Sequence, residues 1–178
     1  MNLSSAPFLA VALTLTGCGA VTAAIGPGTP PLDDTQALHG QELLVREALD
    51  AWHAAAAASD EAAYFALMTP DAIFLGTDTT ERWTRDEFQA YAHRPFSEGH
   101  GWRMHTIRRD VVMVNFYVAY FDEDLEAANL GPARGSGVLF RDAQGQWRIA
   151  HYNLAITVPN DRFDAVRTLL AAPPVPAP

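Results

Sequence analysis

The sequence of 178 residues contains no lysine and only one cysteine. The lack of lysine excludes Schiff-base formation and catalysis by a lysine amine. Because Cys18 is alone, no disulfide can form within the chain. All 12 basic residues are arginine, and the net charge is −9. This balance leaves no basic footprint for nucleic acid or an anionic membrane surface, and we expect neither as a direct partner.

Motifs for metals, phosphates and nucleotides are also missing. The histidines include no HExxH motif or close pair, and the lone cysteine adds no further ligand. There is no glycine-rich phosphate loop, no dinucleotide fingerprint and no Gly-x-Ser-x-Gly elbow. We therefore expect neither a metal site nor a cofactor.

Residues 1–18 have the pattern of a targeting segment. Phe8–Leu15 form an apolar stretch that is shorter than the roughly 20 residues needed to span a bilayer. Its length suits the core of a signal peptide. It ends in Leu-Thr-Gly-Cys18, which resembles the lipobox of bacterial lipoproteins, although the usual basic residue before the apolar core is missing. We expect a lipid anchor on Cys18 in the bacterial cell envelope, on the outer membrane facing the periplasm in a Gram-negative cell. The alternative is a plain secretory signal with an incidental cysteine.

The remainder of the chain divides into three parts. Residues 19–34 are rich in glycine, proline and alanine, which predicts a flexible tether. Residues 35–172 are sufficient for one folded domain that ends in a short helix. Residues 173–178 are a proline-rich segment, which predicts a disordered tail.

Apolar residues at helical spacing predict three helices at the start of the folded domain. Asp60 is placed to cap the second helix. Thr84 and Glu87 have the spacing of a capping box that opens the third helix, and Pro95 is expected to close it. The predicted helices cover residues 38–56, 60–68 and 85–94.

Strands are expected after these helices, with a tight hairpin turn at residues 142–145 and another turn at Gly131-Pro132. A short terminal helix is predicted after Asn160. Helices followed by antiparallel strands indicate an α+β architecture. The predicted strands cover residues 72–76, 102–109, 110–125, 133–142 and 146–158.

The order of these elements resembles the SnoaL-like group of the nuclear transport factor 2-like superfamily. The segments that carry the resemblance are ALDAWHAAAAASDEAAYFALMTPDAIFLGTDTTERWT, EFQAYA, YFDEDL, RGSGVLFRD and QWRIAHYNLAITVPN. The resemblance implies a curved antiparallel or mixed sheet wrapped around three N-terminal helices, a cystatin-like α+β roll with a cone-shaped pocket. The superfamily includes isomerases, dehydratases, epoxide hydrolases, polyketide cyclases and non-catalytic binders, so the resemblance implies no single activity.

The last predicted strand carries two polar candidates for the pocket. Simple alternation places His151 and Asn153 on the same face as Trp147 and Ile149, and we expect this face to point inward. A histidine can act as an acid or base near neutral pH, and an asparagine can hold a carbonyl or hydroxyl group. The alternative is that both are satisfied polar groups beneath the first helix.

Three consecutive acids follow the aromatic run of the longest strand. One register groups Glu123 with Phe121, and the other groups Asp122 and Asp124 with Tyr120; the sequence does not choose between them. We expect one acid inside and the others in water. A carboxylate enclosed by aromatic groups would have a raised pKa and could serve as a general base. The alternative is a solvated strand end.

Aromatic side chains are expected to form both the core and the pocket wall. Trp83 is expected to act either as a lid or, preferably, as a hydrophobic staple on the third helix. Arg134 is expected to form a salt bridge with one of the acids. The candidates for ligand contact are Trp52, Tyr64, Phe74, Trp83, Tyr91, Tyr120, Arg134 and Asn153.

These features support three functions. The first is binding of a small, largely apolar molecule in the conical pocket. The alternative is a cofactor-independent isomerase, polyketide-cyclase-like enzyme or hydrolase in which His151 acts with one of the three acids. The third is assembly into a homodimer through the outer sheet face, where Tyr152, Leu154 and Ile156 are expected to form an apolar patch.

Overall fold

The computed structural model describes residues 34–172. The predicted signal peptide with Cys18, nearly all of the predicted tether, and the predicted tail lie outside the described residues. The helices are α1 (Asp34–Ala57), α2 (Glu61–Ala66), α3 (Arg85–Ser97) and α4 (Phe163–Ala171), with a short 3-10 helix η1 (Asn160–Arg162) before α4. The strands are β1 (Met68–Leu75), β2 (Arg82–Thr84), β3 (Met104–Met113), β4 (Val118–Ala127), β5 (Gly131–Arg141) and β6 (Trp147–Ile156).

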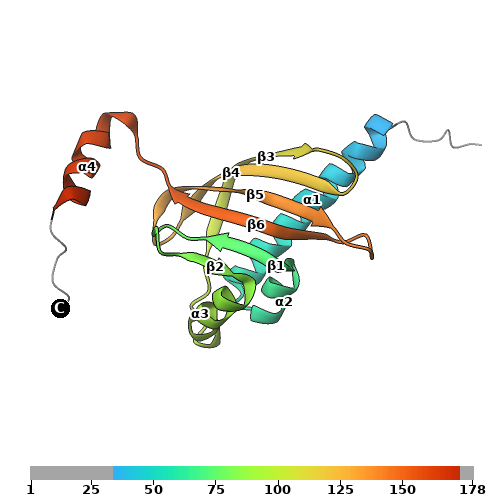
Figure 1. The fold of residues 1–178 in the computed structure, drawn as a ribbon, viewed down its shortest axis with the longest axis horizontal. Coiled ribbons are helices and arrows are strands. Elements are labelled where there is room, and N and C mark those ends of the chain that lie inside the picture. The colour runs from blue at the N-terminus through green and yellow to red at the C-terminus, as the bar shows by residue number, and fades with distance from the viewer. Residues whose placement is uncertain (1–33, 173–178) are drawn as a thin grey trace, which may run out of the picture. The chain divides into compact units, whose positions relative to one another are not determined.

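The strands form one six-stranded sheet in the order β2-β1-β6-β5-β4-β3. β1 runs parallel to β6, and the other neighbours are antiparallel. The sheet curves over α1, with α2 and α3 beside β1 (Figure 1). The predicted α+β fold with a curved, mixed sheet is therefore confirmed.

Both predicted helix caps are confirmed, whereas α1 begins at Asp34 and not at the expected residue 38. The Asp60 side chain accepts a hydrogen bond from the backbone N–H of Ala63 at 2.9 Å. The capping box of α3 is complete: Thr84 accepts from the N–H of Glu87, and Glu87 accepts from the N–H of Thr84. However, α3 continues past Pro95. Pro95 lies in the last turn, so its missing N–H removes a single hydrogen bond near the helix end.

The boundary between β3 and β4 differs from the expected one. The sequence pattern predicts a break between Arg109 and Asp110, whereas the chain turns after Met113. The Asn115 side chain accepts hydrogen bonds from the N–H groups of Tyr117 (2.8 Å) and Val118 (3.0 Å). Such bonds from an asparagine to the backbone two or three residues on are typical of a turn.

β6 contains one extra residue relative to β5. Leu139 pairs with Ile149, but the preceding residue of β5, Val138, pairs with His151, so Ala150 has no partner of its own. This is a β-bulge, and it exchanges the faces on which the following side chains lie. The buried hydrophobic residues of β6 are accordingly Trp147, Ile149, Tyr152 and Leu154.

Candidate functional site

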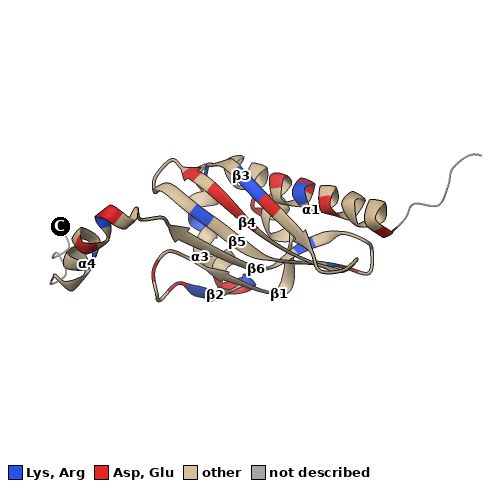
Figure 2. Cartoon of the chain, turned by 90° about the horizontal axis from the view of Figure 1, so that it is seen from above, with Lys and Arg blue, Asp and Glu red and all other residues tan. Residues whose placement is uncertain are grey.

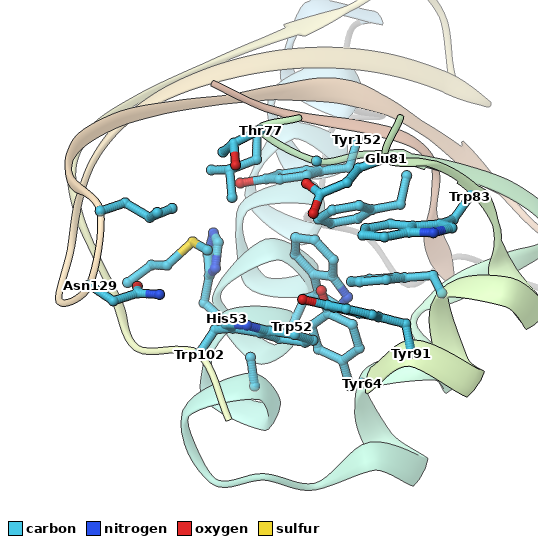
Figure 3. Close-up of a pocket in the computed structure, with 17 residues that line it drawn as sticks. Trp52, His53, Tyr64, Thr77, Glu81, Trp83, Tyr91, Trp102, Asn129 and Tyr152 are labelled. Atoms are coloured by element: carbon cyan, nitrogen blue, oxygen red, sulfur yellow. The ribbon is translucent and has the colours of Figure 1, made fainter. Parts of the chain in front are cut away.

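A pocket opens between α1, the helix pair α2–α3, the inner face of β1 and β6, and the loop after β4. The volume of this cavity is about 140 Å³. Figure 3 shows Tyr152 and Trp102 on opposite sides of the cavity, with His53 on a third side. The aromatic rings in its wall are Trp52, Tyr64, Phe74, Trp83, Phe88, Tyr91, Trp102 and Tyr152.

The aromatic wall is held in place by the capped start of α3. Trp83 stacks on Phe88, with ring centroids 5.5 Å apart, and on Tyr91 at 4.7 Å. Trp83 precedes the cap residue, and Phe88 is the fourth helical residue, so the pair has the spacing of a hydrophobic staple. The predicted staple is therefore confirmed, and the same ring also lines the pocket.

Beneath the pocket lies a fully buried carboxylate, Glu123 of β4. Its Oε1 accepts a hydrogen bond from the Tyr152 hydroxyl at 3.2 Å and lies 2.8 Å from Nε2 of His53. Its Oε2 accepts from Nε of Arg109 at 2.8 Å. Three side chains from three different elements thus converge on one carboxylate, and this satisfies a charge that would otherwise be costly to bury.

The charge state of Glu123 follows from these partners. Burial alone would raise its pKa, but the hydrogen bond and charge of His53 and of Arg109 outweigh burial, so the pKa of Glu123 lies below its ordinary value of 4.5. A raised pKa, as expected for an acid enclosed by aromatic rings, is therefore wrong for this group. Because an ionised carboxylate only accepts hydrogen bonds, Nε2 of His53 carries the proton in this contact.

Arg109 connects the buried carboxylate to the surface. Its Nη1 donates to Oδ1 of Asp50 at 2.6 Å, and its Nη2 to the Thr106 hydroxyl at 3.3 Å. Only 6% of its side chain is exposed. Asp50 and His53 lie one turn apart on α1, so Arg109 and Glu123 together join α1 to the sheet.

His53 and Tyr152 connect the hydrogen-bond network of Glu123 to the pocket, because both residues line it. No residue in the described range 34–172 gives Nδ1 of His53 a hydrogen-bond partner. The Tyr64 hydroxyl, on a side chain that is 3% exposed, also has no partner within that range. Burial raises the pKa of Tyr64 well above its ordinary value of 10.0, so its hydroxyl remains a neutral donor. This imidazole nitrogen and this phenol are therefore two of the polar contacts of the cavity, beside the side chains of Thr77, Glu81 and Asn129 and Nε1 of Trp52, which has no partner in the same range.

Five of the residues predicted to contact a ligand line this pocket, and none of the five has a charged side chain. They are Trp52, Tyr64, Phe74, Trp83 and Tyr91.

The structure does not place His151 and Asn153 in the pocket, and their predicted inward direction is wrong. The bulge at Ala150 reverses the alternation, so both residues share the outer face with Val138 and Ser136 of β5. Tyr152 and Leu154 face the pocket in their place. Asn153 instead borders a second, more open pocket beside the loop after β1.

Asp122, Asp124, Tyr120 and Arg134 also lie on the outer face. Arg108 contacts Asp122 at 2.9 Å and Asp124 at 3.0 Å, and Arg134 contacts Asp124 at 3.4 Å. Figure 2 shows these acidic and basic positions together on β3, β4 and β5. The predicted salt bridge of Arg134 is present, and Tyr120 is 49% exposed. These four residues cannot contact a molecule in the pocket.

The apolar patch proposed for dimer contacts needs the same correction. Tyr152 is fully buried and Leu154 is 8% exposed, because both point inward after the bulge. Of the three residues, only Ile156 is exposed, at 50%. A dimer through the outer face remains a prediction, without this patch.

The sequence interpretation missed His53 and Arg109. His53 follows Leu49 by four residues, so it shares the buried face of α1 with Val45 and Leu49. The sequence signal that could have identified His53 is a polar residue on the otherwise apolar stripe of α1. Arg109 gave no comparable signal, because the predicted strand break at this position hid its inward direction.

Within residues 34–172, no group of three or more His, Cys, Asp and Glu side chains is placed to hold a metal ion. None of the helices in that range is both long and apolar enough to cross a membrane.

Several solved structures are similar to this chain at low sequence identity. An NTF2-like protein of unknown function from Pseudomonas putida has a TM-score of 0.58 and 13% identity, covering 69% of this chain and 91% of that one. A ketosteroid isomerase-like protein from Erwinia carotovora atroseptica has a TM-score of 0.54 and 19% identity, covering 67% and 98%. A protein with a cystatin-like fold from Caulobacter vibrioides has a TM-score of 0.57 and 13% identity, covering 74% and 99%. At these identities the similarity shows the fold alone.

No curated protein matches the sequence. The sequence profile of the SnoaL-like domain matches residues 45–159, which is more than half of the chain and includes the pocket wall from Trp52 to Leu154. The chain therefore belongs to the SnoaL-like domain family.

Proposed function

We propose that this SnoaL-like protein binds one small, largely apolar molecule in the aromatic pocket. The observation that carries the proposal is a cavity of about 140 Å³ walled by eight aromatic rings. An apolar cavity of about 150 Å³ is large enough to bind benzene. The ligand is therefore the size of a single ring or a short branched chain, and its burial among aromatic faces supplies the binding free energy.

The few polar groups of the cavity would orient such a ligand. The Tyr64 hydroxyl and Nδ1 of His53 have no protein partner in the described part of the chain, so a polar atom of the ligand can bond to either without breaking an existing hydrogen bond. Pockets of this composition, mostly apolar with a few placed polar groups, are typical of small-molecule sites.

Native mass spectrometry of gently purified protein, followed by extraction of any bound compound, tests the proposal directly. Tryptophan fluorescence gives a second readout, since Trp52, Trp83 and Trp102 line the pocket. Trp147 lies elsewhere, donating its N–H to Gln41 at 3.1 Å, so a Trp147→Phe variant should keep the ligand response. An empty protein whose fluorescence no member of a panel of single-ring, short branched aliphatic and alkylammonium compounds changes would overturn the proposal.

The Glu123–His53 pair favours a second candidate function, cofactor-independent proton transfer. A carboxylate that fixes one ring nitrogen of a histidine leaves the other aimed as a general base, as in hydrolase triads. Here the free nitrogen is Nδ1, and the neutral Tyr64 hydroxyl can donate to a ligand oxygen. Removal of a proton beside a carbonyl group, followed by its return at another carbon, would give isomerase-type chemistry. Attack of the same enolate carbon on a second carbonyl group of the ligand, whose oxygen then takes the proton back, would give cyclase-type chemistry.

Proton transfer is measured by hydrogen–deuterium exchange at carbon in small carbonyl compounds, followed by NMR in heavy water. Exchange catalysed by the natural chain and lost in His53→Gln supports this function. Exchange that survives this substitution excludes His53 as the base.

The envelope anchor is a separate proposal that rests on the Leu-Thr-Gly-Cys18 pattern. Metabolic labelling with a clickable fatty acid should tag the natural chain and not a Cys18→Ser variant. Equal labelling of both, or of neither, would remove Cys18 as the anchor.

A further inference from the structure

The pocket wall contains no positive charge from arginine, although the chain has 12 arginines. Its ionisable groups, apart from tyrosines, are His53 and Glu81. His53 is already paired with Glu123, whose charge is also balanced by Arg109. Glu81 forms no ion pair within residues 34–172. The cavity therefore has one carboxylate whose negative charge is not balanced by a basic side chain in that range.

The backbone around Glu81 holds this carboxylate in place. Oε2 of Glu81 accepts a hydrogen bond from the N–H of Asp78 at 3.1 Å, and the carbonyl of Glu81 accepts from the N–H of Gly76 at 2.8 Å. A Cβ at position 76 would lie 2.9 Å from Cδ of Glu81 and collide with its oxygen. Only glycine at position 76 lets the carboxylate lie against the strand end, turned toward the cavity (Figure 3).

Aromatic rings are the commonest side chains in the wall around this carboxylate. The faces of tryptophan and tyrosine rings carry negative electrostatic potential and attract cations that approach within about 6 Å. Figure 3 shows Tyr152 and Trp102 flanking the cavity. Tyr91 and Trp83, which stack on each other, lie along another side and add apolar surface. Such a set of rings with a carboxylate at one end is suited to a cation whose charge is spread over alkyl groups.

We propose that the small molecule bound in this pocket is an organic cation, a substituted ammonium whose alkyl groups contact the rings while Glu81 balances its charge. This inference rests on the proposed binding function and specifies its ligand class. An anion would be repelled by Glu81 and would find no arginine. A neutral molecule would displace water from the free Oε1 of Glu81 and leave that oxygen without a hydrogen bond, which costs free energy.

Choline and 3,3-dimethylbutan-1-ol test the charge directly, because they have nearly the same shape and differ in the positive nitrogen. Isothermal titration of the natural chain should show choline binding about tenfold more tightly than the neutral alcohol. This comparison needs no variant, so it does not depend on the folding of one. The acid 3,3-dimethylbutanoate should bind most weakly of the three.

Glu81→Gln should weaken choline binding about tenfold and leave the affinity for the neutral alcohol the same or somewhat higher, because an amide costs less to desolvate than a carboxylate. Glu47→Gln is the matched control, because it removes the same charge from an exposed position of α1 that does not line the pocket. The control should bind choline as the natural chain does.

Equal or tighter binding of the neutral alcohol overturns the cation proposal and leaves the binding function in place. Binding of none of the three probes, together with a protein that is empty by native mass spectrometry and inert to the wider panel, overturns both. Equal losses in Glu81→Gln and Glu47→Gln would assign the effect to net charge and would also overturn the role of Glu81.

Discussion

His53 and Glu123 are joined at 2.8 Å although 70 positions separate them in the sequence. The contact ties α1 to β4 beneath the pocket, and Arg109 binds the opposite oxygen of the same carboxylate. The orientation of the imidazole and part of the stability of the fold therefore depend on one buried acid. Stability and ligand binding should respond together when that acid is changed.

Stability should fall at low pH in a manner that depends on Glu123. Because its folded-state pKa lies below the ordinary value of 4.5, its contribution is complete above that pH and is lost as the pH falls through the folded-state pKa. Glu123→Gln should show a shallower decline below pH 4.5. It should already be about 3 kcal/mol less stable at neutral pH, because Arg109 loses its buried carboxylate partner and keeps only the exposed Asp50. Urea unfolding at a series of pH values measures both effects.

Asp124→Asn is the control for this experiment. Its hydrogen bond with Arg108 also holds the pKa of Asp124 below the ordinary value, but these partners lie on the solvated outer face. We expect a much smaller loss at neutral pH. Equal losses in the two variants would contradict the assignment of Glu123 as the central buried charge.

Gly135 should tolerate no side chain. A Cβ at this position would overlap the Tyr152 hydroxyl and lie 2.8 Å from Oε1 of Glu123. Gly135→Ala should therefore lower the free energy of unfolding by roughly 1–3 kcal/mol through overpacking. Gly40→Ala on α1 meets nothing within 4 Å and should be neutral or stabilising. Denaturant midpoints compare the two, and an unaffected Gly135→Ala variant would contradict the close approach.

Removing the cap of α3 should weaken both the helix and the aromatic wall. Thr84→Ala should cost about 1 kcal/mol, because the N–H of Glu87 loses its side-chain acceptor. Thr84→Ser keeps a hydroxyl and should retain most of that stability. Since Trp83 stacks on Phe88, the alanine variant should also change tryptophan fluorescence. Thermal unfolding followed by fluorescence measures both, and identical alanine and serine variants would argue against the cap.

Substitution of His53 should weaken ligand binding, whereas substitution of His151 should not. His53→Ala removes a pocket side chain and should weaken ligand binding about tenfold. His151→Ala changes the outer face and should leave binding unchanged, because Tyr152 and not His151 lines the cavity. Titration of both variants with one bound compound distinguishes them. Loss of binding in His151→Ala alone would contradict the direction that the bulge imposes.

Local signals predicted much of this molecule from the sequence. The capping box at Thr84 and the cap at Asp60 each depend on two residues three positions apart, so they could be recognised without knowledge of tertiary contacts. Part of the aromatic wall was also predictable, because aromatic side chains at helical spacing, such as Trp52, Tyr64 and Phe88, usually pack inward. Helix caps and apolar periodicity are therefore the sequence signals from which the helices of this fold could be predicted.

The polar part of the site was not predictable in the same way. The sheet register around Glu123 depends on how β3, β4 and β5 pair, and aromatic residues occupy both alternating sets. Nothing in the composition of β6 marks Ala150 as the extra residue, yet every later assignment on that strand depends on it. His53 carried a readable signal on the stripe of α1, but its partner lies 70 positions away.

The extra residue of β6 determines how a deletion in this strand should be interpreted. Without Ala150, plain alternation would keep Ile149 and Tyr152 facing the cavity and leave the imidazole and the amide of β6 outside, so the loss of one codon here would remove the bulge and preserve the lining. A relative of full length would turn the imidazole toward the ligand only if its β6 paired without a bulge. A gap at this position in an alignment of related chains therefore marks a strand without a bulge and not a chemically different cavity.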